Sequence, residues 1–402
     1  MPWPQPAPTA KWQRVVKFFH SQRETICHNR RLQQGLTRSS PLRESAINAT
    51  GDVRTTMTIV KSLYLDNIRL LSPLGDSAAT TYNAVRASIS GFADDLFLVP
   101  GYERIKAARI PEAALPPLSA ALLMEGLTSR QRRILRLSTP SVQALAGDSG
   151  ALDAPLIWVV APEAAQTRNN FAQQAPRYLA EQAGVSLHPT QNKILPYGRA
   201  GVFQALAEAD QMLQQGQYNH VYIGASDTFF DNRSLAVLAA DNRIASRSAT
   251  NAFIPGEAAV FFRVSRQPSG QSAIALGAPG RALEQAHINS DQPCLGAGLD
   301  QAWKQALDCL NGSQVSTLIS SLNGELYWAR ELGVAAMRNS AQFSEGYAHL
   351  HPADCYGDCG AATGALGIAM ACQGLLENQI QGAVLIYSSS DHTPRGAVLA
   401  AR

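Results

Sequence analysis

The sequence predicts an α/β fold made of two related halves, with helices packed on the faces of two sheets. Two observations support this prediction. Short apolar runs typical of buried strands alternate with longer runs typical of helices, a pattern that indicates largely parallel sheets with right-handed crossovers. One stretch of the chain also occurs twice, which indicates a duplication. Two such halves are expected to pack as helix, sheet, helix, sheet and helix layers.

The repeated stretch begins with Tyr-Gly-x-x-Gly. One copy starts at Tyr197 and the other at Tyr356, 159 residues later. Each is followed by a helical run, a short turn, an apolar strand and Ser-Asp. Small residues at a turn that opens a helix let two backbones approach closely, and they direct the free N–H groups of the helix outward. We expect Arg199 and Asp358, the third residue of each copy, to occupy equivalent positions.

Composition limits the classes of function. The chain has 402 residues, of which 46% are hydrophobic and 16% charged, so it can bury a substantial core. No apolar run approaches the roughly 18–20 residues that span a bilayer, so we expect no membrane partner. The six cysteines lack the density of a disulfide scaffold, and no secretory signal is recognisable. We therefore expect a cytoplasmic protein with free thiols and no cofactor.

Residues 1–56 differ from the rest. They carry nine Lys and Arg against three Asp and Glu, a net charge of +6. Because the whole chain carries +3, residues 57–402 carry a net −3, which gives little electrostatic support to a nucleic-acid partner. We expect a disordered basic tail or a start of translation placed too far upstream, with a transit-like segment as the alternative. The two halves are then expected at 57–268 and 269–402.

The first half has a clear order of elements. Turn-forming residues at 72–77 follow the first strand and end in Ser77, the expected N-cap of the helix at 78–88. Thr128 and Ser129 are the expected cap of the helix at 130–146. The continuous apolar run at 156–160 is typical of a strand covered on both faces. The segment 93–126 is rich in proline and is expected to be irregular. The predicted strands are 64–71, 156–160, 221–225 and one ending at 264, and the predicted helices are 78–88, 130–146, 162–183 and about 200–216.

The second half repeats this order on the same apolar and helical patterns. A polar turn at 265–271 separates it from the first half. The predicted strands are 273–276, 315–321 and 383–387, and the predicted helices are 301–310, 327–337 and the run that follows the second Tyr-Gly-x-x-Gly.

Three fragments in this order resemble the β-ketoacyl synthases of the thiolase fold. They are Leu-Ser-Pro-Leu-Gly at 71–75, followed by Ile-Ser-Gly-Phe; Phe-Ile-Pro-Gly-Glu-Ala-Ala at 253–259; and Gly-Asp-Cys-Gly-Ala-Ala-Thr-Gly at 357–364. The resemblance runs from Tyr64 to the C-terminus and implies the duplicated thiolase-like fold, with layers α-β-α-β-α. It does not by itself imply an activity.

We call the tight turn that opens the helix in each copy of the repeat an elbow, the first following Tyr197 and the second following Tyr356. The chemistry of that family needs a cysteine at the first elbow and two histidines that stabilise an oxyanion. The resemblance places the cysteine at Arg199 or one residue either side, and no Cys, Ser or Thr lies between Asn192 and Asp210. It places the histidines at Asn323 (or the preceding leucine) and at Asp358. We therefore predict that the scaffold is kept and the nucleophile is lost.

Two interpretations of these positions remain open. Arginine offers only hydrogen-bond donors and an ionised aspartate only acceptors, so Arg199 and Asp358 could form a buried bidentate ion pair, which we favour. Arg199 could instead bind an external anion or carboxylate. A relocated nucleophile at Cys355 or Cys359 with His351 as its base is a further alternative, and a metal site at these residues and His349 is disfavoured by their spacing.

The resemblance implies a degenerate ketosynthase homologue without condensing activity. It could be the non-catalytic partner of an active ketosynthase, as chain-length-factor subunits are, or an accessory adaptor similar to thiolase-like proteins associated with type VI secretion. An acyltransferase with a relocated catalytic group is the enzymatic alternative. The expected partners are a second copy or a related synthase, meeting at a strand near 221–225, and an acyl carrier protein or a secretion effector.

Overall fold

The structure is a computed structural model that describes residues 59–99, 103–167 and 169–402. Every described helix and strand belongs to one compact unit, Met57–Arg402. The tail predicted at 1–56 lies outside the described residues. No helix in the described part of the chain is long and apolar enough to cross a membrane.

Most of the described strands form one sheet that contains two sets with the same topology. The spatial order is β5-β4-β6-β7-β1 in one set and β11-β10-β12-β13-β8 in the other. The first three strands of each set are parallel, and the last two are antiparallel to their neighbours. The strands are β1 (Leu63–Leu71), β4 (Leu156–Val159), β5 (Lys193–Leu195), β6 (His220–Thr228), β7 (Glu257–Ser265), β8 (Ile274–Leu276), β10 (Val315–Ile319), β11 (Phe343–Leu350), β12 (Ala383–Ser389) and β13 (Pro394–Ala401).

Two predictions about the sheet need correction. Each half was expected to be largely parallel, but each is mixed; the connection from β12 to β13 is only residues 390–393, which is too short for a crossover and forces antiparallel pairing. A dimer contact was expected at the strand near 221–225. That strand is β6, and it is hydrogen-bonded to β4 on one side and β7 on the other, so it offers no edge to a partner. The edge strand of the first set is β5.

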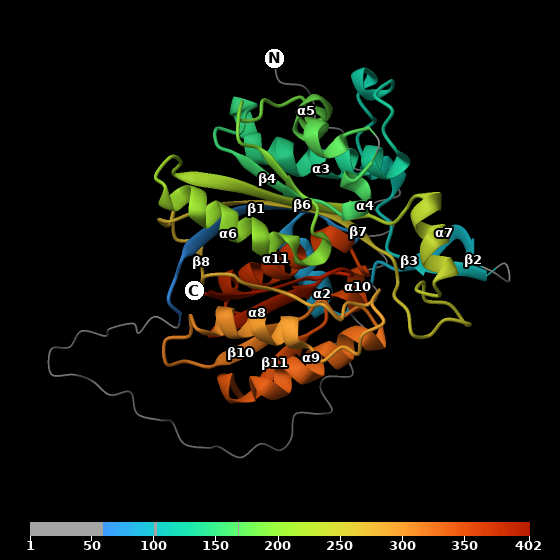
Figure 1. The fold of residues 1–402 in the computed structure, drawn as a ribbon. Coiled ribbons are helices and arrows are strands. Elements are labelled where there is room, and N and C mark those ends of the chain that lie inside the picture. Colours follow the sequence, from blue (N-terminus) through green and yellow to red (C-terminus); the bar gives the residue numbers. More distant parts are fainter. Residues whose placement is uncertain (1–58, 100–102, 168) are drawn as a thin grey trace, which may run out of the picture. The chain divides into compact units, whose positions relative to one another are not determined.

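Helices complete five layers, as predicted (Figure 1). One pair covers the outer face of the first set of strands, one pair lies between the two sets, and one pair covers the outer face of the second set. The pairs are α3 (Ser129–Ala146) with α5 (Phe171–Ala183), α6 (Gly201–Gln214) with α11 (Thr363–Leu376), and α8 (Ala297–Leu307) with α9 (Leu326–Arg338). The two sets of strands are joined where β1 pairs with β8, for example at Leu63 and Leu276.

The central helix α11 is buried around its whole circumference, because α6 and both sets of strands surround it. A helix with that environment needs apolar or small side chains at every turn, which explains why residues 364–372 are all Gly, Ala, Leu, Ile, Met or Cys. Small residues also set its distance from α6. A Cβ atom added at Gly364 would lie 2.7 Å from the carbonyl oxygen of Arg199. The two helix N-termini therefore meet at a contact that only glycine permits.

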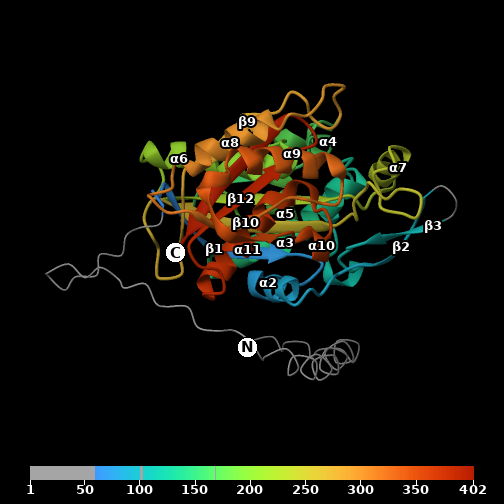
Figure 2. The same cartoon turned by 90° about the horizontal axis from the view of Figure 1, so that it is seen from below.

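Local differences from the predicted elements have local causes. The segment 93–126 contains a hairpin, β2 (Ala93–Val99) and β3 (Glu103–Ala107), which lies beside α7 (Asn232–Ala240) (Figure 2). The helix expected at 162–183 is two helices, because Asn170 adopts a left-handed conformation with φ 52° and ends the continuity. The shorter elements are α2 (Ala78–Arg86), α4 (Pro162–Ala165), β9 (Gly280–Leu283) and α10 (Ala353–Tyr356).

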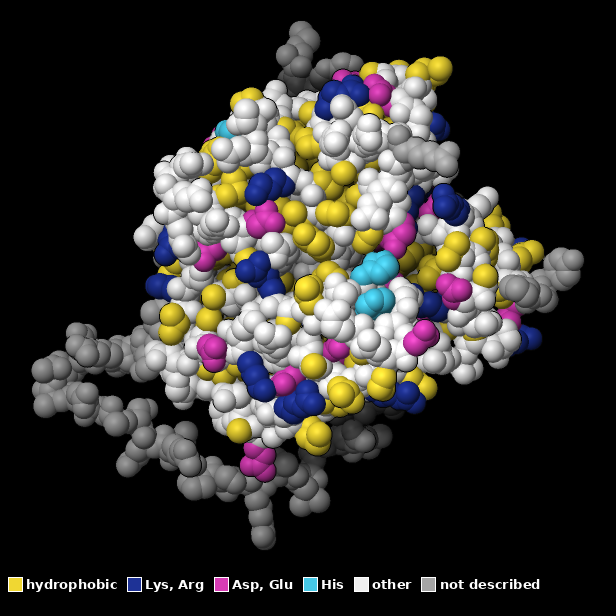
Figure 3. Space-filling view, in the orientation of Figure 1, with side chains coloured by type: hydrophobic (Ala, Val, Ile, Leu, Met, Phe, Trp, Pro, Cys, Tyr) yellow, Lys and Arg dark blue, Asp and Glu magenta, His cyan; other side chains and the backbone are white. Residues whose placement is uncertain are grey.

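The surface fits the charge balance of the body. On the face shown in Figure 3, Lys and Arg side chains are interspersed with Asp and Glu. This face therefore offers no continuous basic patch of the kind that binds a phosphate backbone.

We predict that Gly364→Ala destabilises the protein by about 1–3 kcal/mol, because the added methyl group forces the backbones of α6 and α11 apart. Gly333→Ala is the matched control. Gly333 lies on the exposed side of α9, and an added Cβ would meet no atom within 4 Å, so this change should be neutral or stabilise by about 0.5–1 kcal/mol. Denaturant unfolding of both variants measures the difference, and equal stabilities would contradict the close contact.

Candidate functional site

Two tight turns place the N-termini of α6 and α11 against each other. Gly198 has φ 63° and opens a short 3-10 turn before α6, and Gly360 has φ 53° and does the same before α11. The helices that follow start at Gly201 and Thr363, 162 residues apart. The structural repeat is therefore three residues out of register with the Tyr-Gly-x-x-Gly match. The position equivalent to Arg199 is Ala361, and the predicted equivalence of Arg199 and Asp358 is wrong.

The register differs because the second copy makes an additional bend before its elbow. Gly357 has φ 73°, and Asp358 forms a bridge with Pro255 before the chain turns again at Gly360. The glycines that carry the sequence match therefore have different roles in the two copies. Asp358 lies two residues before the second elbow, and its Oδ1 accepts a hydrogen bond from the backbone N–H of Gly360 at 2.8 Å.

The predicted ion pair between Arg199 and Asp358 is present. The guanidinium Nε lies 3.0 and 2.9 Å from the two carboxylate oxygens, and Nη2 lies 2.6 Å from Oδ2. Arg199 is 4% exposed and Asp358 2% exposed. The two groups thus form a bidentate, charge-assisted contact that is almost entirely removed from solvent.

Asn323 joins the same contact. Its Nδ2 atom donates to Asp358 Oδ2 at 2.7 Å and to Glu325 Oε2 at 3.0 Å. The structure therefore brings together Arg199, Asn323 and Asp358, which the resemblance matched to a cysteine and two histidines. Arg199 and Asn323 both donate to Asp358, and none of the three residues offers a thiol or a hydroxyl group.

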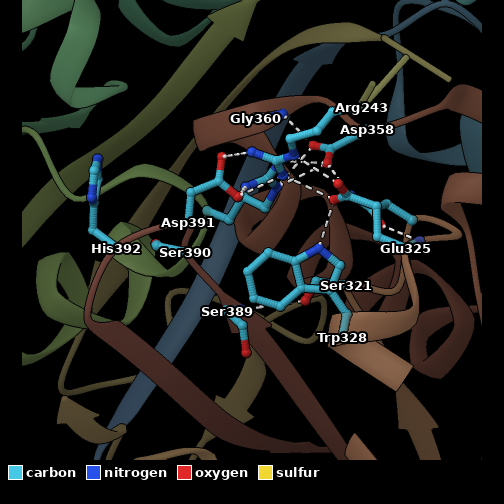
Figure 4. Close-up of polar contacts among 12 residues, drawn as sticks. Arg243, Ser321, Glu325, Trp328, Asp358, Gly360, Ser389, Ser390, Asp391 and His392 are labelled. Carbon is cyan, nitrogen blue, oxygen red and sulfur yellow. Dashed lines mark hydrogen bonds and ion pairs between the residues drawn. The ribbon is translucent and has the colours of Figure 1, made fainter. Parts of the chain in front are cut away.

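Further charged residues extend the network (Figure 4). Arg243 donates through Nε and Nη2 to Glu325 at 2.7 and 2.9 Å, and through Nη1 and Nη2 to Asp391 at 3.1 Å each. Arg199 Nη1 reaches Asp391 Oδ1 at 2.6 Å. The indole N–H of Trp328 donates to Glu325 at 2.9 Å. Sequence reasoning missed Arg243 and Glu325, because no local pattern identifies a tertiary ion-pair partner.

The contacts keep Arg199 and Asp391 charged. Burial alone would lower the pKa of Arg199, but the carboxylates of Asp358 and Asp391 hold it well above its ordinary value. Burial alone would likewise raise the pKa of Asp391, but the guanidinium groups of Arg199 and Arg243 hold it well below its ordinary range. Neither group can therefore exchange a proton near neutral pH.

The backbone N–H groups at the two helix N-termini are also occupied. Ala200 N–H donates to Ser390 Oγ, and Ala361 N–H donates to Asp227 Oδ2, both at 2.9 Å. Arg130 in turn pairs with Asp227 at 2.7 Å. Helix N-termini of this kind can stabilise an oxyanion. Here these two donors are already bound to side chains of the protein.

The candidate relocated residues lie apart from this network. Cys359 is fully buried beside the carbonyl oxygen of Tyr356, and burial raises the pKa of its thiol well above the ordinary value. Burial also raises the pKa of the Cys355 thiol. His351 Nδ1 lies 2.9 Å from Ser320 Oγ, and among the described residues no hydrogen bond joins it to either thiol. Neither thiol has the base that a nucleophile would need.

We predict that Arg199→Met and Asp358→Leu each destabilise the protein by about 3–5 kcal/mol, because each leaves a buried charge without its main partner. The double variant should recover part of that loss, since the two orphaned charges are then both removed. Denaturant unfolding of the wild type, both single variants and the double variant measures the coupling energy. Simple additivity of the two effects would show that the pair does not act as a unit.

Comparisons with known proteins bear on the fold. No protein-family model matches the sequence, and no curated protein matches it. Among solved structures, the chain is similar to the ishigamide ketosynthase/chain length factor (TM-score 0.66, 11% identity, 85% of this chain and 99% of that one). It is also similar to a ketosynthase in complex with its chain length factor from Xenorhabdus doucetiae (TM-score 0.65, 13% identity, 85% of this chain and 98% of that one).

A ketosynthase domain of the oxazolomycin synthase from Streptomyces albus matches with a TM-score of 0.63 and 10% identity, over 85% of this chain and 75% of that one. Likeness at such identities carries information about the fold and not about the reaction. Together with the two pseudo-equivalent sets of strands, it shows that this chain has the thiolase-like fold of the ketosynthases.

Proposed function

We propose that this chain is a non-catalytic partner subunit of an active ketosynthase. One observation carries the proposal: Arg199, Asn323 and Asp358 bind one another where the resembling family is expected to hold a cysteine and two histidines. Acyl transfer through that cysteine needs a thiolate in front of a helix N-terminus and free donors for the oxyanion. Arg199 cannot accept an acyl group, and its donors are already used.

A partner role is supported by the kind of structure the chain resembles. Two of its neighbours are described as a ketosynthase/chain length factor and as a ketosynthase in complex with its chain length factor. The match covers 99% and 98% of those chains, so the likeness extends over a whole subunit of such assemblies. An enzyme of this fold without its nucleophile is most easily explained as the second subunit of a pair whose chemistry is done by the first. Carrier-bound acyl substrates would then react on that first subunit.

The edge strand β5 is the surface we assign to the partner. Leu195 C=O accepts from Val160 N–H at 3.1 Å, so the polar backbone groups of Leu195 face β4. Successive residues of a strand alternate in this respect, and the N–H and C=O of Ile194 therefore point to the open edge. Unpaired groups on an edge are a template for a strand of another chain. The second copy or related synthase expected from the sequence would extend the sheet here.

We predict that no acyl-enzyme forms on this chain. Incubation with acyl- and malonyl-carrier protein should leave its intact mass unchanged, because the buried thiols lack both access and a base. The partly exposed Cys294 is the site where background modification is expected, so Cys294→Ser serves as the control. Acylation of the folded protein on any residue, above the level in a denatured sample, would contradict the proposed function.

We also predict that Ile194→Pro abolishes pairing while the chain stays folded. Proline removes an N–H that faces the open edge and leaves the hydrogen bonds to β4 in place. The control is His349→Pro in β11, the edge strand of the second set. Leu350 C=O accepts from Ser320 N–H there, so the backbone of His349 faces outward in the same way. Light scattering measures the mass of the purified protein, alone and mixed with the cognate ketosynthase. The paired species should be absent for Ile194→Pro and present for His349→Pro. Loss with both variants or with neither would exclude β5 as the interface.

A further inference from the structure

Asp391 differs from the other members of the charged network in its exposure. Its side chain is 26% exposed, whereas those of Arg199 and Asp358 are 5% and 1% exposed. It also comes from the turn at 390–393 between β12 and β13, and not from an elbow. Asp391 is therefore the most exposed of the charged side chains in the network, ahead of Arg243 at 14%. Figure 4 shows it beside the other members.

Two arginines hold this one carboxylate. Asp391 Oδ1 accepts from Arg199 Nη1 at 2.6 Å and from Arg243 Nη2 at 3.1 Å, and Oδ2 accepts from Arg243 Nη1 at 3.1 Å. A pair of guanidinium groups that converges on both oxygens of a carboxylate is the arrangement by which proteins recognise free carboxylates. We call these two residues the arginine clamp.

The clamp is held in place without Asp391. Arg199 keeps its bidentate contact with Asp358, and Arg243 keeps its bidentate contact with Glu325. Each guanidinium thus has its own carboxylate, and the N–H groups that remain are directed at the place where the Asp391 carboxylate lies. Departure of Asp391 would leave neither arginine unpaired, which removes the main cost of breaking a buried ion pair.

The turn that carries Asp391 is anchored on both sides of it. Ser390 Oγ bonds the backbone of the first elbow at Ala200 N, and Arg395 Nη1 donates to the carbonyl oxygens of Ser390, His392 and Pro394. The backbone of the turn is therefore fixed. Exchange of the carboxylate requires only that the Asp391 side chain rotates out, which is a small motion on a fast timescale.

The walls of the clamp restrict what can enter. The ring of Trp328 lies 5.8 Å from the Arg199 guanidinium carbon, and the ring of Phe253 lies 5.9 and 5.5 Å from those of Arg199 and Arg243. The aromatic rings thus lie beside both guanidinium groups, and the most exposed charged member of the clamp is the Asp391 carboxylate. A ligand carboxylate would take the place of that group.

We propose that the arginine clamp is a receptor for an external carboxylate at the end of a slender organic group, and that Asp391 is a built-in competitor for it. The ligand class is a small organic acid or the acid end of a longer chain. The proposal concerns binding alone, and it holds whether or not the chain pairs with a synthase. It also unites the two roles expected for Arg199, since one guanidinium both pairs with Asp358 and offers a donor to a ligand.

The test compares the wild type with Asp391→Ala. We expect sodium acetate and sodium octanoate to raise the melting temperature of the variant and to show saturable binding by calorimetry, with sodium chloride at equal ionic strength as the salt control. The wild type should bind at least about tenfold more weakly, because its own carboxylate must first leave the clamp. A similar response to both acids assigns recognition to the carboxylate alone, and a stronger response to octanoate assigns it to the end of an apolar chain; either supports the proposal.

Three further variants keep the result interpretable. Asp391→Asn retains one acceptor oxygen but loses the charge and the second acceptor, so it should bind acetate more tightly than the wild type and less tightly than the alanine variant. Asp148→Ala removes an exposed aspartate in the turn after α3 and should behave as the wild type. Asp391→Ser replaces the alanine variant if the latter does not fold. No response of the Ala or Ser variant beyond that to chloride would overturn the receptor. If octanoate binds the Ala or Ser variant but does not bind the wild type even at a saturating concentration, the proposal that a ligand can displace the Asp391 carboxylate is overturned.

Discussion

A guanidinium buried in front of a helix N-terminus is the constraint on which the centre of this molecule depends. The N-terminal end of a helix carries partial positive charge, so Arg199 lies where a cation is disfavoured both by burial and by the helix dipole. Such a group is stable only when anions surround it. The carboxylates of Asp358 and Asp391 supply that charge, and Asn323 and Arg243 then satisfy the oxygens that remain. The charged network follows from the presence of an arginine at this one position.

The same rule holds at other places where charge is buried near the ends of the strands. Arg395 pairs with Glu331 at 2.6 Å, and Arg133 pairs with Glu257 at 2.6 Å. In each case a hydroxyl group donates a further hydrogen bond to the carboxylate: Ser389 donates to Glu331, and Thr228 donates to Glu257. A buried pair stabilises little by itself, but breaking one is costly, so these contacts fix the arrangement of the loops more than they add to stability.

Much of the fold could be predicted from the sequence, because it depends on patterns that are local. The apolar strands, the helix caps and the duplication all have periodic or repeated signals, and the five layers follow from them. The register of the repeat could not be predicted, because Gly198 matches Gly357 in the sequence but matches Gly360 in its position at the start of the 3-10 turn before the helix. The ion pair was therefore predicted correctly from an equivalence that does not exist.

The rest of the site has no local signal. Arg243, Glu325 and Asp391 are far apart in the sequence and meet only after both halves have folded. The hairpin of β2 and β3 was hidden by the prolines that flank it, and β5 by its short length. The resemblance could identify which positions to compare with the family. Sequence could not identify the partners that meet at those positions, since ion pairing requires only opposite charges that come together in space.

The charge count at the elbow has a consequence for how this site could change over evolutionary time. The network holds two arginines and three carboxylates. A cysteine placed at position 199 would stand among Asp358, Glu325 and Asp391 with only Arg243 to balance them, a local charge of −2. Such surroundings raise the pKa of a thiol and disfavour the thiolate. A single substitution to cysteine would thus yield an inert thiol and a destabilised protein. Several residues would have to change together before this position could carry a nucleophile.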